Sequence, residues 1–511
     1  MGSPAGIQLT LLLIDLAQFE AAAATAFATV FSPIGLAFLV GATLLGVTVG
    51  SIPGLGGPVA LSLLIPVTFE LDPKLAFLVL AATLGGVNFG GSITAVLLNT
   101  PGTAPNAATT FDGFPLATQG RGAEAIAASA IASGAGALLG LSLFVVLLPV
   151  LTPVALAFWS PEYFWLAVVG IATIAVASDG SVLDDLIAGG VGIALTFHGV
   201  STVTGGIRYT AGTQYLQSGV PLVPAIIGLF AIAQMVELFA TDTTVADGGS
   251  IAGDRLRGVK ATLTRWPTVI GSGVLGWAIG VVPGVGGTVA NFVAYLQVKE
   301  RSDDPESFGE GNIAGVIASE AANDAKDGGS LVPTLALGIP GSASTAVLLS
   351  AFLLHGLTPG PLLLSEGLDV VFVVLLALVC SNVLTSAVGL VGSPVFAKVT
   401  RVPPSILLPV VFGLAVIGAF AVRGRAADVA LMAGFGLLGY AMRRLDVSRI
   451  ALVIGLVLGG LVEENFHRSL QISGGDYAIF VSRPLSIALI VVSLVVLAIP
   501  LRRAYRGMLS E

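Results

Sequence analysis

The sequence predicts an all-α, polytopic membrane protein of about 12 transmembrane helices, arranged as two inverted repeats with broken or re-entrant helices. Hydrophobic residues make up 55% of the 511-residue chain, charged residues only 10%, and the mean hydropathy is +0.97. A soluble domain usually carries about 25% charged residues. Apolar runs of spanning length alternate with short polar connectors, and a glycine-rich motif occurs twice. The low charge and high hydrophobicity predict a membrane protein, and the duplicated motif predicts the two repeats.

The duplicated motif runs from Gly41 to Gly57 and again, 230 residues later, from Gly271 to Gly287. Each copy is an apolar segment interrupted by Pro-Gly-x-Gly-Gly. Inside a bilayer this break frees backbone groups, which only protein or a water-filled cavity can satisfy. Matched breaks in two related halves indicate a transporter binding site. The residues predicted to form these two breaks are Pro53, Gly54, Gly56 and Gly57, and Pro283, Gly284, Gly286 and Gly287.

A second pair of breaks follows, with hydroxyl and amide side chains beside the Pro-Gly turns. A half-helix that begins inside the membrane directs its N–H groups and its positive dipole end at whatever lies before it, which suits a carboxylate. The predicted substrate site consists of Asn99, Thr100, Pro101, Gly102 and Thr103 in the first half, and Pro340, Gly341, Ser342, Ser344 and Thr345 in the second. The alternative is that these breaks only kink helices for packing. Four breaks in matched pairs favour a site.

Glu320, Asn323 and Asp324 are predicted to share one face of a helix, because they are three and four residues apart. One interpretation is an intramembrane relay for a proton or Na⁺, since a carboxylate within a membrane is costly and usually functional. The other is a helix end at the interface, because Lys326 and Gly328 follow at once. Both interpretations stay open from the sequence.

Other polar residues receive less specific predictions. Arg208 either holds a carboxylate or is a solvated loop arginine. Asp112 is predicted to be a turn residue, and Glu463, Glu464 and His467 to line an interfacial loop.

The sequence also excludes several classes of function. No GxxxxGK[ST] motif, HExxH motif or Ser/His/Asp order is present, so neither ATP hydrolysis nor another enzymatic activity is predicted. The three histidines have no metal-ligand spacing, and the single cysteine forms no disulfide framework. Gly86 and Gly90 have the small-xxx-small spacing of tightly packed helices.

Charge distribution suggests the organisation of the chain. We expect an apolar or interfacial segment over 1–30, a first membrane repeat over 31–240, a hydrophilic linker over 241–266, a second repeat over 267–501 and a basic tail over 502–511. The basic linker and tail are predicted to be cytoplasmic, and the start, which lacks Lys and Arg, to be external. Equal inverted halves would put the tail outside, so one half has an extra or a missing span.

Three stretches, 85–122, 276–295 and 309–341, resemble the large permease subunit of the tripartite tricarboxylate transporters, the TctA family. The resemblance covers about Pro33 to Ser486. It implies a secondary symporter in the cell membrane that imports citrate or another small carboxylate, coupled to Na⁺ or H⁺. It also implies two partners, a small TctB-like membrane subunit and an extracytoplasmic TctC-like binding protein, and no nucleic acid.

The chain departs from the family pattern at two positions. Ser201 stands where the family commonly has aspartate, which weakens a carboxylate role there, and Asp324 adds a charge that bears on ion preference. A stand-alone ion-coupled organic-anion carrier or antiporter is the alternative within transport. A membrane enzyme should show catalytic side chains gathered at one depth, and an assembly scaffold would not need paired broken helices.

Overall fold

The protein is described here from a computed structural model. The structure describes residues 4–52, 54–176, 181–201, 205–241, 251–283, 286–392, 394–396 and 404–508. The chain is 81% helical. The described strands, β1 (Gly199–Val200) and β2 (Ile207–Arg208), pair antiparallel in one short hairpin. The predicted all-α class is therefore confirmed.

In the first half, helices follow one another with short connections. They are α1 (Pro4–Val30), α2 (Pro33–Gly50), α3 (Gly57–Thr68), α4 (Pro73–Leu98), η1 (Ala104–Asn106), α5 (Ala107–Thr118), α6 (Gly122–Leu156), α7 (Ser160–Val176), α8 (Val182–Thr196), η2 (Tyr215–Ser218), α9 (Leu222–Ile227), η3 (Gly228–Ile232) and α10 (Ala233–Thr241). The element η3 is one turn of π-helix that continues α9 into α10.

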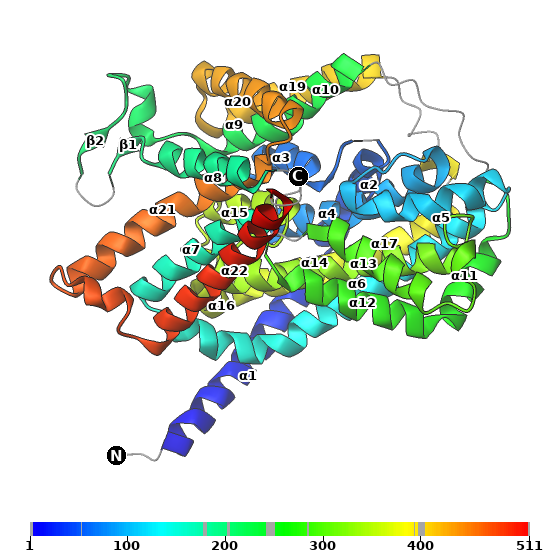
Figure 1. The fold of residues 1–511 in the computed structure, drawn as a ribbon, viewed down its shortest axis with the longest axis horizontal. Helices are drawn as coiled ribbons and strands as arrows, with labels where there is room; N and C mark the ends of the chain where they lie inside the picture. The colour runs from blue at the N-terminus through cyan, green and yellow to red at the C-terminus, as the bar shows by residue number, and fades with distance from the viewer. Residues whose placement is uncertain are drawn as a thin grey trace.

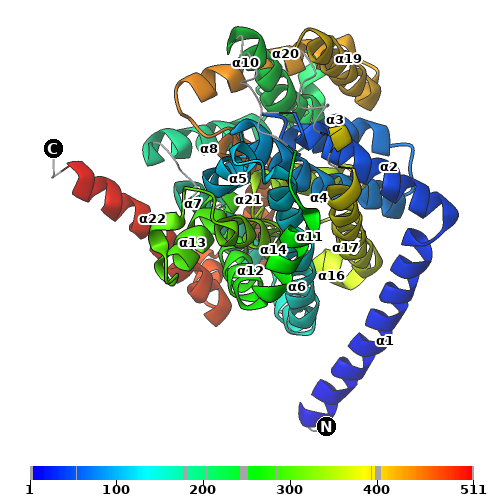
Figure 2. The ribbon, with the colours of Figure 1, turned by 90° about the vertical axis from the view of Figure 1, so that its right-hand side faces the viewer.

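Helices also follow one another through the second half. Its helices are α11 (Arg255–Thr264), α12 (Trp266–Val281), α13 (Gly286–Glu300), η4 (Pro305–Ser307), α14 (Ile313–Leu337), α15 (Ala343–Leu354), α16 (Pro361–Glu366), α17 (Leu368–Val391), α19 (Pro404–Arg423), α20 (Ala426–Arg444), α21 (Arg449–Ile472), η5 (Tyr477–Phe480) and α22 (Pro484–Met508). Figure 1 shows α10, α19 and α20 along one edge and α11 at the end opposite the β1–β2 hairpin. Figure 2 shows α1 and α22 projecting from opposite sides of the helical body.

Six described helices are long and apolar enough to cross a membrane. They are Pro33–Gly50, Pro73–Leu98, Gly122–Leu151, Leu222–Ala240, Leu368–Val391 and Arg449–Ile472. Shorter apolar helices accompany them: Gly57–Thr68, Trp266–Val281, Ala343–Leu354, Leu408–Arg423 and Pro484–Ala498. Length and composition thus agree with a multi-pass membrane protein, and the number of crossings stays a prediction.

Helix starts follow from local chemistry. Ser32 accepts a hydrogen bond from the Gly35 amide and Asp72 accepts one from the Lys74 amide, so each caps the helix that follows. Proline occupies the next position in both, where its missing N–H has no partner to lose and its fixed φ suits a first turn. The sequence pair Ser/Asp-Pro therefore sets where α2 and α4 begin.

The two halves make the same contacts between equivalent helices. A Cβ atom at Gly46 of α2 would lie 2.3 Å from the Thr83 carbonyl oxygen of α4, and one at Gly276 of α12 would lie 2.5 Å from the Ala322 carbonyl oxygen of α14. Gly50 lies against Val87, and Gly280 lies against Lys326, in the same relation. The glycines are 230 residues apart and their partners 239, so the duplication seen in the sequence is also present in the packing.

Gly86 and Gly90 of α4 behave as their spacing predicts. A Cβ atom at Gly86 would lie 2.3 Å from the Thr43 carbonyl oxygen, and one at Gly90 would lie 2.4 Å from the Val47 carbonyl oxygen. Both glycines let α2 and α4 approach backbone to backbone. The prediction of tight helix packing is confirmed.

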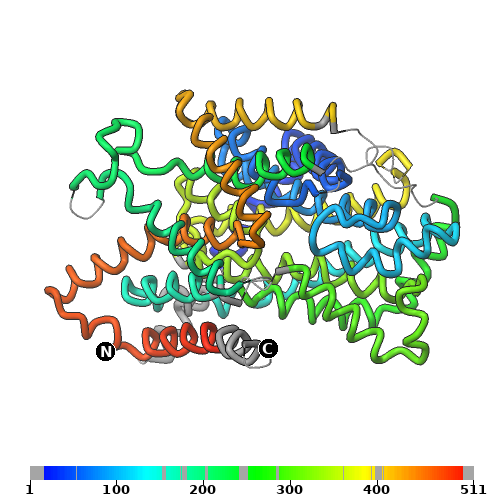
Figure 3. Tube along the Cα trace, turned by 45° about the horizontal axis from the view of Figure 1, so that its top comes forward, coloured from blue at the N-terminus to red at the C-terminus, as the bar shows by residue number. Residues whose placement is uncertain are grey.

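Helices of one half pack on helices of the other half, and several of these contacts occur twice with the roles of the two halves exchanged. Helix α3 contacts α15 while its counterpart α13 contacts α5, and α8 contacts α21 while α20 contacts α9. Likewise α17 packs on α4 and α6 packs on α14. The tube view in Figure 3 shows segments from the two halves alternating through the body instead of forming two separate lobes.

Helices α4 and α14 meet at the centre and run in opposite directions. Asn88 of α4 contacts Asp324 and Asp327 of α14, whereas Ser92, one turn further along α4, contacts Glu320, one turn earlier on α14. Asn88 and Asp327 are equivalent positions of the two halves, 239 residues apart. Equivalent helices of an inverted repeat run in opposite directions, and this antiparallel contact agrees with that arrangement.

The end of the predicted linker is structured. Helix α11 packs on α6, where Gly258 lies against the Glu124 carbonyl and Thr262 Oγ1 donates to the Ala128 carbonyl oxygen at 3.4 Å. Residues 242–250 of the linker lie outside the described residues. The domain boundaries themselves stay a prediction.

The glycine contacts give a stability prediction. We expect Gly276→Ala to destabilise the protein by about 1–3 kcal/mol, because the new methyl group must push α12 away from the α14 backbone. Gly271→Ala is the control on the same helix, since a Cβ atom there meets no atom within 4 Å. Thermal unfolding of the two purified variants in detergent measures the difference. Equal melting temperatures would show that α12 and α14 are not in this close contact.

Candidate functional site

The predicted breaks are present in both halves. Helix α4 ends at Leu98 and Asn99 follows with φ 53°, while α14 ends at Leu337 and Gly338 follows with φ 72°. Both are left-handed conformations that end a helix, and asparagine and glycine are the residues that adopt them most readily. In the other pair, α2 ends before α3 begins at Gly57, and α12 ends before α13 begins at Gly286. Pro53 and Gly284 lie outside the described residues.

The four breaks converge. A Cβ atom at Gly56 would lie 3.9 Å from Thr103 Cγ2, and one at Gly57 would lie 2.4 Å from Ser344 Oγ. The first break therefore lies between the two turns that were predicted to hold substrate. In the second half, a Cβ atom at Gly287 would lie 2.8 Å from Pro105 Cγ. The Gly56-Gly57 corner, where α3 begins, thus contacts the break between α14 and α15 in the second half. The Gly286-Gly287 corner, where α13 begins, contacts the break between α4 and α5 in the first half.

The side chains around the turns have different environments. Ser342 and Thr345 cap α15: the Ser342 amide donates to Thr345 Oγ1 at 2.8 Å, and the Thr345 amide donates to Ser342 Oγ at 3.3 Å. Thr103 is buried and donates to Asn106 Oδ1. Asn99 and Thr100 are exposed. The remaining residues of these turns are placed as follows: Gly102, Pro340 and Gly341 are buried, and Pro101 and Ser344 are half-buried.

Glu320 lies at the centre of a buried network of donors. Its carboxylate accepts hydrogen bonds from Ser92 Oγ at 2.7 Å, from Ser133 Oγ at 3.0 Å and from Thr109 Oγ1. Asn106 Nδ2 donates to Ser92 Oγ at 3.0 Å and reaches Glu320 Oε1 at 3.5 Å. Helices α4, α5, α6 and α14 and the element η1 therefore meet at one carboxylate. Donors from several elements suit a negative charge in a buried site.

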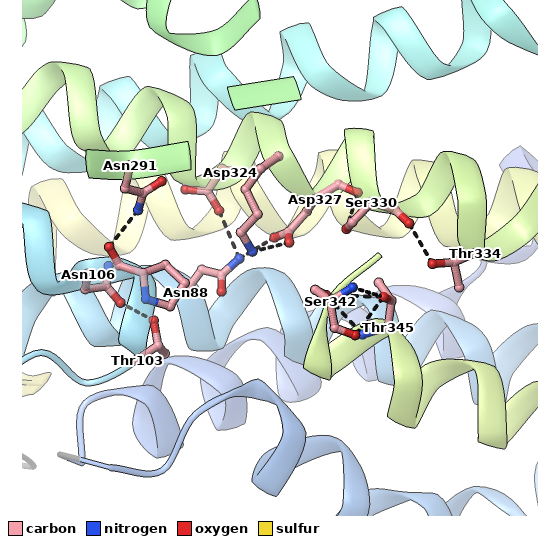
Figure 4. Close-up of polar contacts among 12 residues, drawn as sticks. Asn88, Thr103, Asn106, Asn291, Asp324, Asp327, Ser330, Thr334, Ser342 and Thr345 are labelled. Carbon is pink, nitrogen blue, oxygen red and sulfur yellow. Dashed lines mark hydrogen bonds and ion pairs between the residues drawn. The ribbon is translucent and has the colours of Figure 1, made fainter. Parts of the chain in front are cut away.

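One turn further along α14, the network continues with more charge. Asn88 Nδ2 donates to Asp324 Oδ1 at 3.3 Å and also to Asp327 Oδ2, and Lys326 Nζ forms an ion pair with Asp327 Oδ1. Figure 4 shows Asn88, Asp324 and Asp327 between the turn of Thr103 and Asn106 and the turn of Ser342 and Thr345. The charged network thus lies between the two predicted substrate turns.

Some polar atoms of this network make no hydrogen bond to any of the described residues. They are Asp324 Oδ2 and both amide atoms of Asn323, and the two side chains are 2% and 0% exposed. Buried polar groups are normally hydrogen-bonded, so each exception calls for an explanation. Carboxylate and amide oxygens side by side are suitable ligands for a small hard cation.

The helix-end interpretation of Glu320, Asn323 and Asp324 is wrong. Helix α14 continues through Lys326 and Gly328 to Leu337, and all its residues from Gly315 to Ala336 are buried. The cluster therefore lies in the middle of a buried helix. The sequence left both interpretations open because glycine next to charged residues also marks many helix ends.

Asp112 and His467 were wrongly predicted to lie in turns or loops. Asp112 lies within α5, is fully buried, and accepts backbone hydrogen bonds from Gly309, Gly311 and Asn312. It thereby fixes the loop that precedes α14, as it satisfies three amides at once. His467 lies inside helix α21, as do Glu463 and Glu464. A glycine after Asp112 suggested a turn, but helix packing overrides this weak local preference.

Arg208 has a structural partner. Its guanidinium forms a bidentate ion pair with Glu463, with Nη1 and Nη2 facing the two carboxylate oxygens. This contact fixes the β1–β2 hairpin to α21. Arg208 therefore does hold a carboxylate, that of Glu463, and it is not a solvated loop arginine.

A separate cavity of about 600 Å³ lies beside Gly338, at the break between α14 and α15. Its wall includes Gly338 at the break, Trp159 just before α7, and Glu464, Asn465 and Arg468 of α21. The sequence gave no indication of this cavity, because its polar residues come from a helix more than 100 positions away from the break.

Sequence reasoning missed most donors of the central network. The missed residues are Asn88, Ser92, Asn106, Thr109 and Ser133. A signal did exist for Asn88 and Ser92: both are polar, yet they lie inside an apolar run of spanning length. The structure buries this stretch of α4 completely. Polar residues at membrane depth are costly, and therefore candidates for function.

Comparison with known proteins decides the family. The family model described as the tripartite tricarboxylate transporter TctA family matches residues 36–454. This chain belongs to that family. An Agrobacterium vitis protein described as an uncharacterized 52.8 kDa protein in the TAR-I ttuC' 3' region is 32% identical over 492 residues, covering 94% of this chain and 96% of the relative. Membership in TctA makes the chain a permease component of a transport system.

A second TctA-like relative covers half of the chain. It is described as an uncharacterized protein in the TAR-II ttuC' 3' region of Agrobacterium vitis, and is 33% identical over 232 residues, 45% of this chain and 96% of the relative. No solved structure matches. The family and the multi-pass helical fold together place this TctA member in a membrane.

Proposed function

We propose that this chain is the large permease subunit of a secondary importer of small carboxylates, citrate-like or other tricarboxylates, in the cell membrane. The observation that carries the proposal is the convergence of four helix breaks on one buried polar network. Exposed backbone groups at such breaks bind ions and charged substrates in transporters. Family membership supports the substrate class, since the family is described by tricarboxylate transport.

Coupling to Na⁺ or H⁺ belongs to the same proposal. Glu320, Asn323 and Asp324 are buried on one face of α14, and Asp324 Oδ2 and Asn323 Oδ1 have no hydrogen-bond partner in the part of the chain that the structure describes. A bound cation gives these oxygens ligand contacts and offsets the cost of the buried carboxylates. The substrate then occupies the space next to the turns at Thr103 and Ser344, and the cation occupies the carboxylate face of α14.

Alternating access follows from the repeat. The antiparallel contact of the equivalent helices α4 and α14 supports an inverted repeat, in which one part of the core moves relative to the rest around a fixed site. A small TctB-like membrane subunit and an extracytoplasmic TctC-like binding protein complete the proposed system. The binding protein delivers the carboxylate to the outer side.

The experiment that tests the function is an uptake screen. Proteoliposomes hold this chain with its small membrane subunit, with and without the binding protein, and receive radiolabelled citrate, other tricarboxylates or dicarboxylates under an imposed Na⁺ or pH gradient. Gradient-driven uptake that needs the binding protein supports the proposal. Uptake that is equally fast without the binding protein favours the stand-alone carrier, and absence of carboxylate uptake under every gradient contradicts both.

Two substitutions test the turns. Thr103→Val and Ser344→Ala are each expected to reduce uptake about tenfold, because each removes a hydroxyl group beside the Gly56-Gly57 corner without adding bulk. Thr118→Val is the control, because its exposed hydroxyl only bonds within α5. Uptake and membrane levels are measured together. Unchanged uptake in both variants would remove these turns from the substrate site.

A further inference from the structure

Lys326 is a cation buried at the meeting point of two breaks. Its side chain is 6% exposed, and its hydrocarbon chain passes Gly287, where a Cβ atom would lie 2.5 Å from Lys326 Cε and 2.8 Å from Pro105 Cγ. Its ammonium group therefore lies where the break between α12 and α13 meets the break between α4 and α5. A carboxylate bound at these breaks would reach this ammonium.

The ion pair between Lys326 and Asp327 joins two adjacent residues of one helix. Adjacent residues of an α-helix project about 100° apart, so they do not normally face each other. The contact depends on the flexible lysine chain bending back over its own helix. Asp327 has an additional donor in Asn88, whereas Lys326 has Asp327 as its charged partner among the described residues. When the flexible lysine chain turns away from this partner, Asp327 keeps Asn88 as a donor.

The network carries more negative than positive charge. Within the described residues it contains three carboxylates, Glu320, Asp324 and Asp327, and one ammonium group, Lys326. A buried excess of negative charge is costly, and a substrate anion adds to it. An anion can bind here only when cations compensate the carboxylates. Charge balance thus links the arrival of the carboxylate to the arrival of cations.

We propose that Lys326 is the cationic contact for a substrate carboxylate and that Asp327, once released from Lys326, takes a coupling cation. The inference rests on the proposed function and deepens it. The substrate carboxylate replaces Asp327 as the partner of the ammonium group. Asp327 then carries an uncompensated charge in the interior, which a Na⁺ ion or a proton neutralises. Neither ligand binds well without the other, and this mutual dependence is the coupling.

The test uses proteoliposomes with the full chain and its partner subunits, and radiolabelled citrate or the carboxylate most active in the uptake screen. Lys326→Gln is expected to raise the half-saturating substrate concentration at least about 30-fold, while Lys326→Arg retains part of the affinity because it keeps the charge. Asp327→Asn is expected to keep substrate exchange but to lose accumulation against a gradient. Its uptake should also depend on one cation fewer.

Controls separate this role from a structural one. Asp428 is a fully buried aspartate that forms an ion pair with Arg423 outside the central network. Asp428→Asn should therefore keep the wild-type cation dependence. If a single variant fails to fold, the neutral double variant Lys326→Gln/Asp327→Asn replaces it, since removing both charges leaves no unpaired ion. Gel filtration in detergent identifies folded protein.

The outcomes are distinct. Wild-type cation dependence in Asp327→Asn, or an unchanged half-saturating concentration in Lys326→Gln, overturns the inference and leaves the proposed function standing. The same holds if the double variant transports with wild-type coupling. If the wild-type protein takes up no carboxylate under any gradient, the proposed function itself fails.

Discussion

Glu320→Gln is expected to reduce coupled carboxylate uptake at least about 30-fold while the protein still reaches the membrane. The Glu320 carboxylate accepts hydrogen bonds from hydroxyl and amide donors of four surrounding elements, and it is fully buried. Glutamine has nearly the same shape, but it turns one acceptor into an NH₂ group that faces those donors. It also removes the charge that a coupling cation requires.

The measurement is gradient-driven uptake in proteoliposomes, corrected for the amount of folded protein. Glu124→Gln is the matched control, because Glu124 is another buried glutamate, paired with Arg121 outside the network. We expect that variant to stay within about threefold of wild type, as one partly exposed ion pair contributes little. Full, cation-dependent uptake by Glu320→Gln would show that the central carboxylate has no part in transport.

Gly57→Ala is expected to reduce uptake at least about tenfold, with a smaller effect on thermal stability. The new Cβ atom would lie 2.4 Å from Ser344 Oγ and 3.2 Å from Leu84 Cδ1. The α3 corner and the start of α15 must then separate, and the two breaks no longer enclose the same space. The expected loss is therefore in substrate affinity more than in folding.

Two further variants make this prediction specific. Gly41→Ala is the control, because a Cβ atom at this α2 glycine meets no atom within 4 Å. In the background of Gly57→Ala, Ser344→Gly removes the side chain in the way, so the double variant should not lose uptake by a second factor of ten. A Gly57→Ala protein with normal substrate affinity would mean that the corner and the α15 turn do not meet.

The sequence by itself determined the class and the repeat. Low charge and long apolar runs require a membrane, because no soluble fold could cover so much apolar surface. The duplicated Pro-Gly motifs marked the helix breaks, since proline and glycine act locally: one lacks an N–H donor and the other adopts left-handed backbone, as Gly338 does. These properties belong to short stretches of chain and need no knowledge of distant neighbours.

The tertiary structure alone decided which side chains meet. Asn88 reaches Asp327 across 239 residues of sequence, and Asp112 holds the loop at Gly309 to Asn312 from a different helix. Arg208 pairs with Glu463 in the same way. Such contacts depend on how helices pack, and a local pattern carries no information about the distant partner. For that reason the breaks could be predicted, whereas the charged network between them could only be seen once the helices were assembled.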